Sequence, residues 1–420
     1  MNSPIIRQPT DWKSAAMRKR IARRYGAESR FRWMGLAAVA ISAGFLAFLL
    51  VSMLYTGLGG FTRTEVKLPL DFPTLGLQIS PASLEGAAAK AVLINADIDG
   101  AVTRAGETAF GTEAGNIIGE NAGRAVRDAL LDDPSLLTRK AVIGVPAATA
   151  LALASKGEGD PATLARYRAL EDKGVIAKSF STHFLTESDA TQADEVGIWG
   201  AFKGSLLTML VTLMLAFPVG VLSAVYLEEY APKNVWTDLI EVSINNLAAV
   251  PSIIFGLLGL AVFLGFFGMP RSAPLVGGLT LALMTMPVIV IAGRNAIKAV
   301  PPSIRDAALG IGASPVQVVF HHVLPLALPG ILTGTIIGMA RALGETAPLL
   351  MIGMRAFIST PPEGTTSPSS VLPVQIFLWS DEVSRGFVEK TSAAIIVLLV
   401  FLLAMNGIAI YLRNRFEQRW

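Results

Sequence analysis

The sequence predicts an all-α polytopic membrane protein with six transmembrane helices and a small domain inserted on the outer side. Its composition is 52% hydrophobic and only 16% charged, whereas soluble domains carry about 25% charged residues. Six long apolar segments occur, and about 20 apolar residues are enough to cross the hydrocarbon core of a bilayer. A polar block of about 140 residues, the size of a small domain, separates the first two segments.

The six apolar segments define the expected spans and the domain boundaries. We expect transmembrane helices near residues 34–58, 202–227, 244–267, 274–297, 326–351 and 391–412. The domains that follow are a basic N-terminus at 1–33, the first helix at 34–58, an insert at 59–196, a five-helix core at 197–412 and a tail at 413–420.

The distribution of basic residues predicts the orientation. Lysine and arginine concentrate on the cytoplasmic side of membrane proteins. Nine of them lie in the first 32 residues, and Arg413, Arg415 and Arg419 lie in the tail. Six spans bring both ends to the same side, so we expect both termini in the cytoplasm and the insert outside. A basic arm for nucleic acid is the alternative, and we favour the membrane anchor.

The insert holds 13 basic and 19 acidic residues and therefore has a net charge of −6. Weak alternation predicts a strand over 62–71, and helical periodicity predicts helices over 116–131 and 161–170. We expect a small α+β or mostly helical domain. The chain has no cysteine, which excludes disulfides and thiolate metal sites. Two roles stay open for the insert, docking a binding protein or shielding the outer face.

A polar, turn-rich segment lies between the fourth and fifth spans, on the expected cytoplasmic side. Ser303 and Asp306 have the spacing of a helix capping box. Ser314 and Gln317 repeat that spacing, and Pro315 falls at the first helical position, where its missing N–H costs nothing. Gly310 and Gly312 are expected to form the bend between the two helices, and Pro325 is expected to end the second helix. These features predict two short capped helices joined as an elbow.

This elbow resembles the cytoplasmic coupling loop of type I ABC importer permeases, and the loop would extend over about 299–325. The family pattern is Glu-Ala-Ala, three residues, glycine, nine residues and Ile-x-Leu-Pro. The matching positions are Asp306, Ala307, Ala308, Gly312, Leu324 and Pro325. The departures are aspartate at the glutamate position, which keeps the charge, and His322 at the aliphatic position. The resemblance implies that the matching residues pass motion between a soluble ATPase and the membrane helices.

The fifth span carries a stripe of small residues and a charged pair. Small residues recur every four positions, which lets another helix approach closely; they are Gly330, Gly334, Gly338 and Ala342. Arg341 and Glu345 are four apart, so they can pair on one helix face. Arg341 follows Leu326 by 15 residues, roughly 22 Å along a helix and deep in the expected bilayer. A guanidinium is costly there and matches phosphate geometry. We assign Arg341, Glu345 and Thr346 to a substrate path, with a purely structural pair as the alternative.

Three stretches resemble the phosphate permease family PstA. They are RALGETAPLL at 341–350, NLAAVPSIIFGLLGLAVFL at 246–264 and LPVQIF at 372–377. The resemblance covers about residues 200–412, half of the chain. Ala347, Pro348 and Leu349 favour PstA over its sister permease PstC. The long insert departs from the compact family members and resembles an extended bacterial subclass.

The resemblance implies a permease subunit of an ATP-driven importer of inorganic phosphate in the bacterial inner membrane. The implied partners are a PstC-like second permease, two PstB-like ATPase subunits, a PstS-like periplasmic phosphate-binding protein, membrane lipid and a phosphate-sensing regulator, without nucleic acid. No GxxxxGK(S/T) loop occurs in the chain. ATP and Mg are therefore expected on the ATPase, and the chain itself is expected to be no enzyme and to hold no cofactor or metal. A permease for phosphonate, sulfate or molybdate and a membrane phosphate sensor stay open as alternatives.

Overall fold

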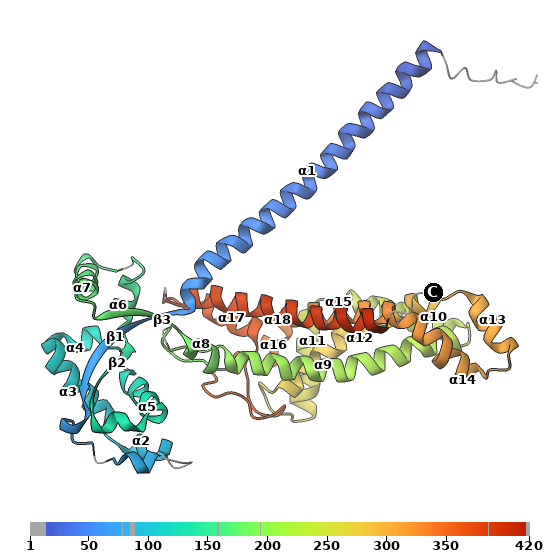
Figure 1. Ribbon diagram of the computed structural model, residues 1–420. Coiled ribbons are helices and arrows are strands. Elements are labelled where there is room, and N and C mark those ends of the chain that lie inside the picture. Colours follow the sequence, from blue (N-terminus) through green and yellow to red (C-terminus); the bar gives the residue numbers. More distant parts are fainter. Residues whose placement is uncertain are drawn as a thin grey trace, which may run out of the picture. The chain divides into compact units, whose positions relative to one another are not determined.

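The computed structural model describes residues 14–416, apart from 78, 85–88, 158, 194 and 385. The chain divides after Tyr55 into two units. The first unit contains most of the helix α1 (Ala15–Gly60), and the second starts at Thr56 (Figure 1). Residues 1–13 of the predicted basic N-terminus and 417–420 of the predicted tail lie outside the described residues. The predicted domain boundaries stay predictions.

The helix α1 is longer than the span predicted at 34–58. It begins at Ala15 because the basic segment before the span is rich in Arg, Lys and Ala, which favour helices. Its apolar part is long and apolar enough to cross a membrane. Large side chains such as Phe45 and Val51 are exposed along it, which suits a helix surrounded by lipid.

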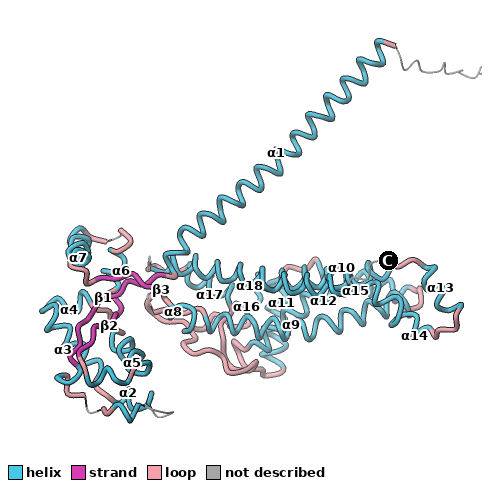
Figure 2. Tube along the Cα trace, viewed as in Figure 1, coloured by secondary structure: helices cyan, strands magenta, loops and turns pink. Residues whose placement is uncertain are grey.

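The insert is an α+β domain built on a three-stranded antiparallel sheet (Figure 2). The strand β1 (Thr62–Asp71) lies between β2 (Lys140–Pro146) and β3 (Ile176–Phe180), and the strand predicted over 62–71 is confirmed. Val66, Leu68 and Leu70 are at most 1% exposed. They alternate along β1 because successive side chains of a strand point to opposite faces, and this face meets the core of the insert.

Short helices surround the sheet. They are α2 (Ala89–Asn95), α3 (Ile98–Phe110), α4 (Ala114–Ile117), α5 (Ala122–Asp132), α6 (Thr149–Ala154), α7 (Pro161–Asp172) and α8 (Thr182–Thr186). The helix predicted over 161–170 is confirmed as α7. The one predicted over 116–131 is interrupted between α4 and α5, because Ile118 pairs with Ala147 in a β-bridge and the Gly119 N–H donates to the Pro146 carbonyl at 2.8 Å.

The rest of the second unit is a helical bundle. Its helices are α9 (Trp199–Val225), α10 (Val235–Ala248), α11 (Ser252–Gly259), α12 (Pro274–Lys298), α13 (Pro302–Gly310), α14 (Pro315–Gln317), α15 (Leu324–Gly344), α16 (Ala347–Met351), α17 (Leu372–Ser380) and α18 (Gly386–Phe416). Wider π-helical turns continue α9, α11 and α14 at Tyr226–Tyr230, Leu260–Phe266 and Val318–Val323. The helix α12 is central, since it contacts α9, α10, α11 and α15.

Within the described residues, five helices are long and apolar enough to cross a membrane, and a bent pair adds a sixth span only if its two helices are counted as one. Two spans differ from their predicted course. The third, predicted over 244–267, is bent by 100° between α10 and α11, where Pro251 caps α11 and interrupts the helical hydrogen bonds. The fifth, predicted over 326–351, ends at Gly344, because the ring of Pro348 is incompatible with a helix that continues through Gly344.

The small residues of α15 face α12. A Cβ added at Gly330 would lie 2.7 Å from the Cβ of Ala296, and one added at Gly334 would overlap that of Ala292. At Gly338 the nearest atom would be the Cγ2 of Thr285 at 3.0 Å. The two helix backbones therefore approach as closely as glycine allows.

We expect Gly334→Val to destabilise the bundle by about 1–3 kcal/mol, because overpacking a close contact forces neighbouring side chains and backbone to shift. The thermal unfolding midpoint of the purified protein in detergent measures this. The matched control is Gly407→Val on α18, where an added Cβ would meet nothing within 4 Å. Equal midpoints for the two variants would contradict the packing role.

Candidate functional site

The predicted elbow consists of α13, a turn and α14, which continues through a π-helical turn into α15. Gly312 forms the turn with a φ of +92°, a conformation that residues with a Cβ rarely adopt. Its N–H donates to the Leu309 carbonyl at 3.0 Å, and that of Ala313 donates to Ala308 at 3.1 Å. These bonds satisfy carbonyl groups that the end of α13 would otherwise leave open.

The capping box predicted at the second helix of the elbow is confirmed. The backbone N–H of Ser314 donates to the side-chain oxygen of Gln317 at 2.9 Å, and the Gln317 N–H donates to the Ser314 Oγ at 3.4 Å. Pro315 follows as the first helical residue. The start of α14 is therefore fixed by residues that the sequence identifies.

Two other details of the predicted elbow are wrong. Ser303 does not cap the first helix, because α13 already begins at Pro302 and its N-cap is Pro301. A proline at the first position has a suitable φ for starting a helix, so the boundary moves toward the N-terminus. Pro325 does not end a helix either. It lies in the first turn of α15, where its missing N–H is tolerated.

The elbow carries an exposed apolar surface, here called the tip. Its four large side chains are 44–82% exposed, and they are Leu309, Ile311, Val316 and Phe320. Asp306 and Ala307 are also exposed, whereas Ala308 is buried with Val318 and Val323 in the core at this end of the bundle. Exposed apolar patches mark surfaces that meet another protein or a membrane. The sequence pattern singles out the small residues of the elbow but not the tip.

Arg305 of α13 joins the elbow to the end of α9. Its guanidinium donates to Glu229 at 2.6 and 3.2 Å and to the carbonyl oxygens of Val300 at 2.7 Å and Ile297 at 3.0 Å. Both charged side chains are mostly buried. A planar guanidinium held by several acceptors fixes orientation as well as distance, so α13 cannot rotate independently of α9 and α12.

A second charged cluster lies nearby on α12. Arg294 donates to Glu241 of α10 at 2.9 Å and to Glu228 beyond α9 at 3.4 Å, and Lys298 lies 3.9 Å from Glu228. The sequence shows these charges but not which of them pair, because linear spacing does not reveal which helices meet. One feature of the sequence points to this cluster: two adjacent acidic residues, Glu228 and Glu229, stand at the end of an apolar span and need basic partners.

The predicted path residues lie where α15 ends. Arg341 Nε donates to Glu345 Oε1 at 3.4 Å, and the arginine side chain is half exposed. Glu345 follows α15 directly, and Thr346 precedes α16. The structure thus brings the three predicted residues together at a helix break, apart from the elbow. Among the described residues, no group of three or more His, Asp or Glu side chains could hold a metal ion.

Two family models match the sequence. One, described as Domain of unknown function (DUF3333), matches residues 18–165 and covers α1 and most of the insert. The other, described as Binding-protein-dependent transport system inner membrane component, matches residues 216–419. The second match contains the elbow, both charged clusters and Arg341.

Several curated proteins are similar to parts of the chain. The probable ABC transporter permease protein YqgI of Bacillus subtilis (strain 168) is 31% identical over 261 residues, which cover 57% of this chain and 86% of YqgI. The phosphate transport system permease protein PstA of Yersinia pestis is 31% identical over 215 residues, which cover 51% of this chain and 71% of PstA. PstA 1 of Mycobacterium tuberculosis (strain CDC 1551 / Oshkosh) is 35% identical over 156 residues, 37% of this chain and 51% of that protein.

Solved structures of transporters are also similar to parts of the chain. An inward-facing MetNI methionine ABC transporter matches at 17% identity with a TM-score of 0.38, over 53% of this chain and 95% of that one. A bacterial alginate ABC transporter in complex with its periplasmic protein matches at 17% identity with a TM-score of 0.41, over 60% of this chain and 88% of that one.

We expect Glu229→Ala to loosen the elbow, because the Arg305 guanidinium loses its charged acceptor. Amide hydrogen exchange over residues 302–310 of the purified chain should become several-fold faster. Asp238→Ala on α10 removes an exposed carboxylate elsewhere and serves as the control. If both variants exchange at the wild-type rate, Arg305 does not hold α13 in place.

Proposed function

This chain belongs to the ABC transporter permease family, and we propose that it forms one membrane half of an ATP-driven importer of inorganic phosphate. The phosphate specificity is supported by relatives that are named phosphate transport system permeases. The observation that carries the permease role is the capped elbow with its exposed apolar tip, which gives a soluble partner a surface to grip.

In the proposed assembly, the tip inserts into a groove on one of two PstB-like ATPase subunits. Asp306 and Ala307 lie exposed beside the tip and would complete this contact. Movement of the ATPase would then reach the bundle through Arg305, because its guanidinium joins α13 to Glu229 at the end of α9. ATP and Mg would be held and used by the ATPase, so this chain would perform no chemistry of its own.

The substrate path would run between this chain and a PstC-like second permease. A PstS-like binding protein would release phosphate on the outer side, with the insert there and both termini in the cytoplasm. Arg341 is half exposed on this chain and could face such a path. Glu345, 3.4 Å from the guanidinium, would compete with the anion and prevent it from being trapped. Conduction requires sites that bind weakly enough to release.

Uptake of labelled phosphate by phosphate-starved cells, with and without this chain, tests the proposal. We expect uptake to require the chain and to resist excess unlabelled sulfate, molybdate and phosphonate. Asp306→Arg should abolish uptake at an unchanged membrane level, because it reverses a charge on the ATPase contact, whereas Asp238→Arg outside the elbow should transport normally. Uptake that is unchanged without the chain would refute phosphate import, and strong competition by another oxyanion would reassign the substrate.

For the path, we expect Arg341→Ala to lower phosphate uptake at least tenfold while the chain still co-purifies with its partner subunits. Arg341→Lys should fall between this variant and the wild type, because it keeps the charge but loses the paired hydrogen bonds. Phosphate uptake and co-purification with the partner subunits are measured on the same membranes. Loss of co-purification together with uptake would instead identify the Arg341–Glu345 pair as structural.

A further inference from the structure

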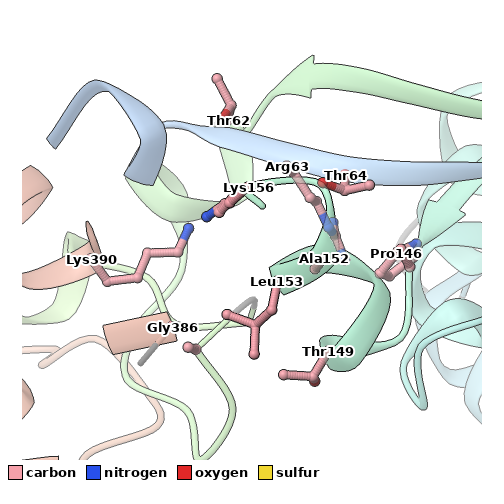
Figure 3. A pocket seen from close by; sticks show the side chains of 12 residues that line it. Thr62, Arg63, Thr64, Pro146, Thr149, Ala152, Leu153, Lys156, Gly386 and Lys390 are labelled. Atoms are coloured by element: carbon pink, nitrogen blue, oxygen red, sulfur yellow. The ribbon is translucent and has the colours of Figure 1, made fainter. Parts of the chain in front are cut away.

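A small cavity lined by both polar and apolar residues lies where the insert meets the bundle (Figure 3). It measures about 40 Å³ and is lined by residues of β1, of the segment from β2 through α6, and of the start of α18. Because about 10–15 Å³ is enough for one water molecule, this cavity has room for a few waters or for one small ion.

Three cationic side chains line this cavity. They come from separate parts of the chain: Arg63 from β1, Lys156 from the turn after α6 and Lys390 from α18. Figure 3 shows the ammonium groups of Lys156 and Lys390 pointing toward one another. None of the described residues that line the cavity carries a carboxylate. This concentration of positive charge contrasts with the insert as a whole, whose net charge is −6.

The two lysines are held in place by different contacts. Lys390 is only 5% exposed, donates to the Gly60 carbonyl at 2.8 Å and lies 5.0 Å from the ring centroid of Phe184. Lys156 forms an ion pair with Glu389, which neighbours Lys390 on α18. The carboxylate of Glu389 thus pairs with Lys156, while the ammonium group of Lys390 is held by a carbonyl and a ring. Like charges in such a partly buried space repel more strongly than in water.

Two of these cationic side chains also help to lower the pKa of a nearby histidine, His183. Burial lowers the pKa of His183 to about 4, and Arg63, Arg124 and Lys390 contribute to the lowering. His183 is therefore neutral at pH 7 and adds no charge of its own. Burial alone would disfavour any charge, but the part of the lowering that comes from Arg63, Arg124 and Lys390 reflects a positive field, which favours an anion.

We propose that this cavity binds a small tetrahedral oxyanion, with inorganic phosphate as its ligand, at the outer mouth of the bundle. The identity of the ligand and the outer location rest on the proposed function. Arg63 and Lys156 would donate charge-assisted hydrogen bonds to the anion. Glu389 would hold Lys156 in the empty site and release it when the anion arrives.

The competing explanation is that the same charges only fasten the insert to α18. The two explanations differ at Glu389. If the carboxylate competes with the anion for Lys156, its removal frees a cation and strengthens anion binding. If the pair is only a fastening, its removal weakens the attachment of the insert and leaves anion affinity unchanged.

Binding of radiolabelled inorganic phosphate to the purified full-length chain in lipid nanodiscs tests the site. We expect Arg63→Gln and Lys156→Met each to weaken binding at least tenfold, because each removes a charged donor. Glu389→Gln should strengthen binding several-fold. Lys140→Met is the control, since it removes an exposed lysine of the insert that does not line the cavity. Wild-type affinity in the Arg63 and Lys156 variants, or unchanged or weaker binding in Glu389→Gln, would overturn the site.

Competition and parallel uptake measurements separate this inference from the proposed function. If uptake requires the chain but the Arg63 and Lys156 variants bind phosphate with wild-type affinity, the site is refuted and phosphate import stands. If sulfate binds in preference to phosphate and depends on the same residues, inorganic phosphate as the ligand of this cavity is refuted, and phosphate import is still decided by the uptake measurement.

Discussion

The rest of the bundle depends on the close contact of α12 with two of its neighbours, α9 and α15. In lipid, apolar surface gives no driving force between helices, so close packing has to hold them together. Glycines on both sides make that approach possible. A Cβ added at Gly278 would lie 2.5 Å from Val211 of α9, and one at Gly220 would lie 2.8 Å from Ile289 of α12. With α12 fixed in this way, polar groups at its end have defined partners.

The charged clusters at the end of α12 join the elbow to the packed helices α9 and α12. Arg294 and Arg305 each reach acidic residues that follow α9, and Arg305 also binds backbone carbonyls at the end of α12. The elbow is therefore attached on one side and exposed on the other. An element attached in this way can move as a rigid piece, which a flexible loop could not do.

The sequence predicts features that depend on local chemistry. The strand β1, the helix α7 and the Ser314 cap follow from residues that are neighbours in the chain. The wrong predictions have a common physical cause, which is proline. Pro302 starts α13 before Ser303. Pro251 bends the third span, which hydropathy treats as continuous, and Pro348 ends the helix of the fifth. Arg341 and Glu345 were paired correctly because they are four residues apart. Neither Arg305 with Glu229 nor the lining of the insert cavity could be paired in this way, since their members are far apart in sequence.

The bond from Lys390 to the Gly60 carbonyl also has a consequence for biosynthesis, since it spans 330 residues. During synthesis at about 5–20 residues per second, roughly 15–65 seconds pass between the appearance of the two partners. The insert must fold and survive on its own during that interval. Its own hydrophobic core, centred on β1, makes this possible. The later arrival of α18 then completes the junction, so a helix made long after the insert decides whether the insert is correctly seated.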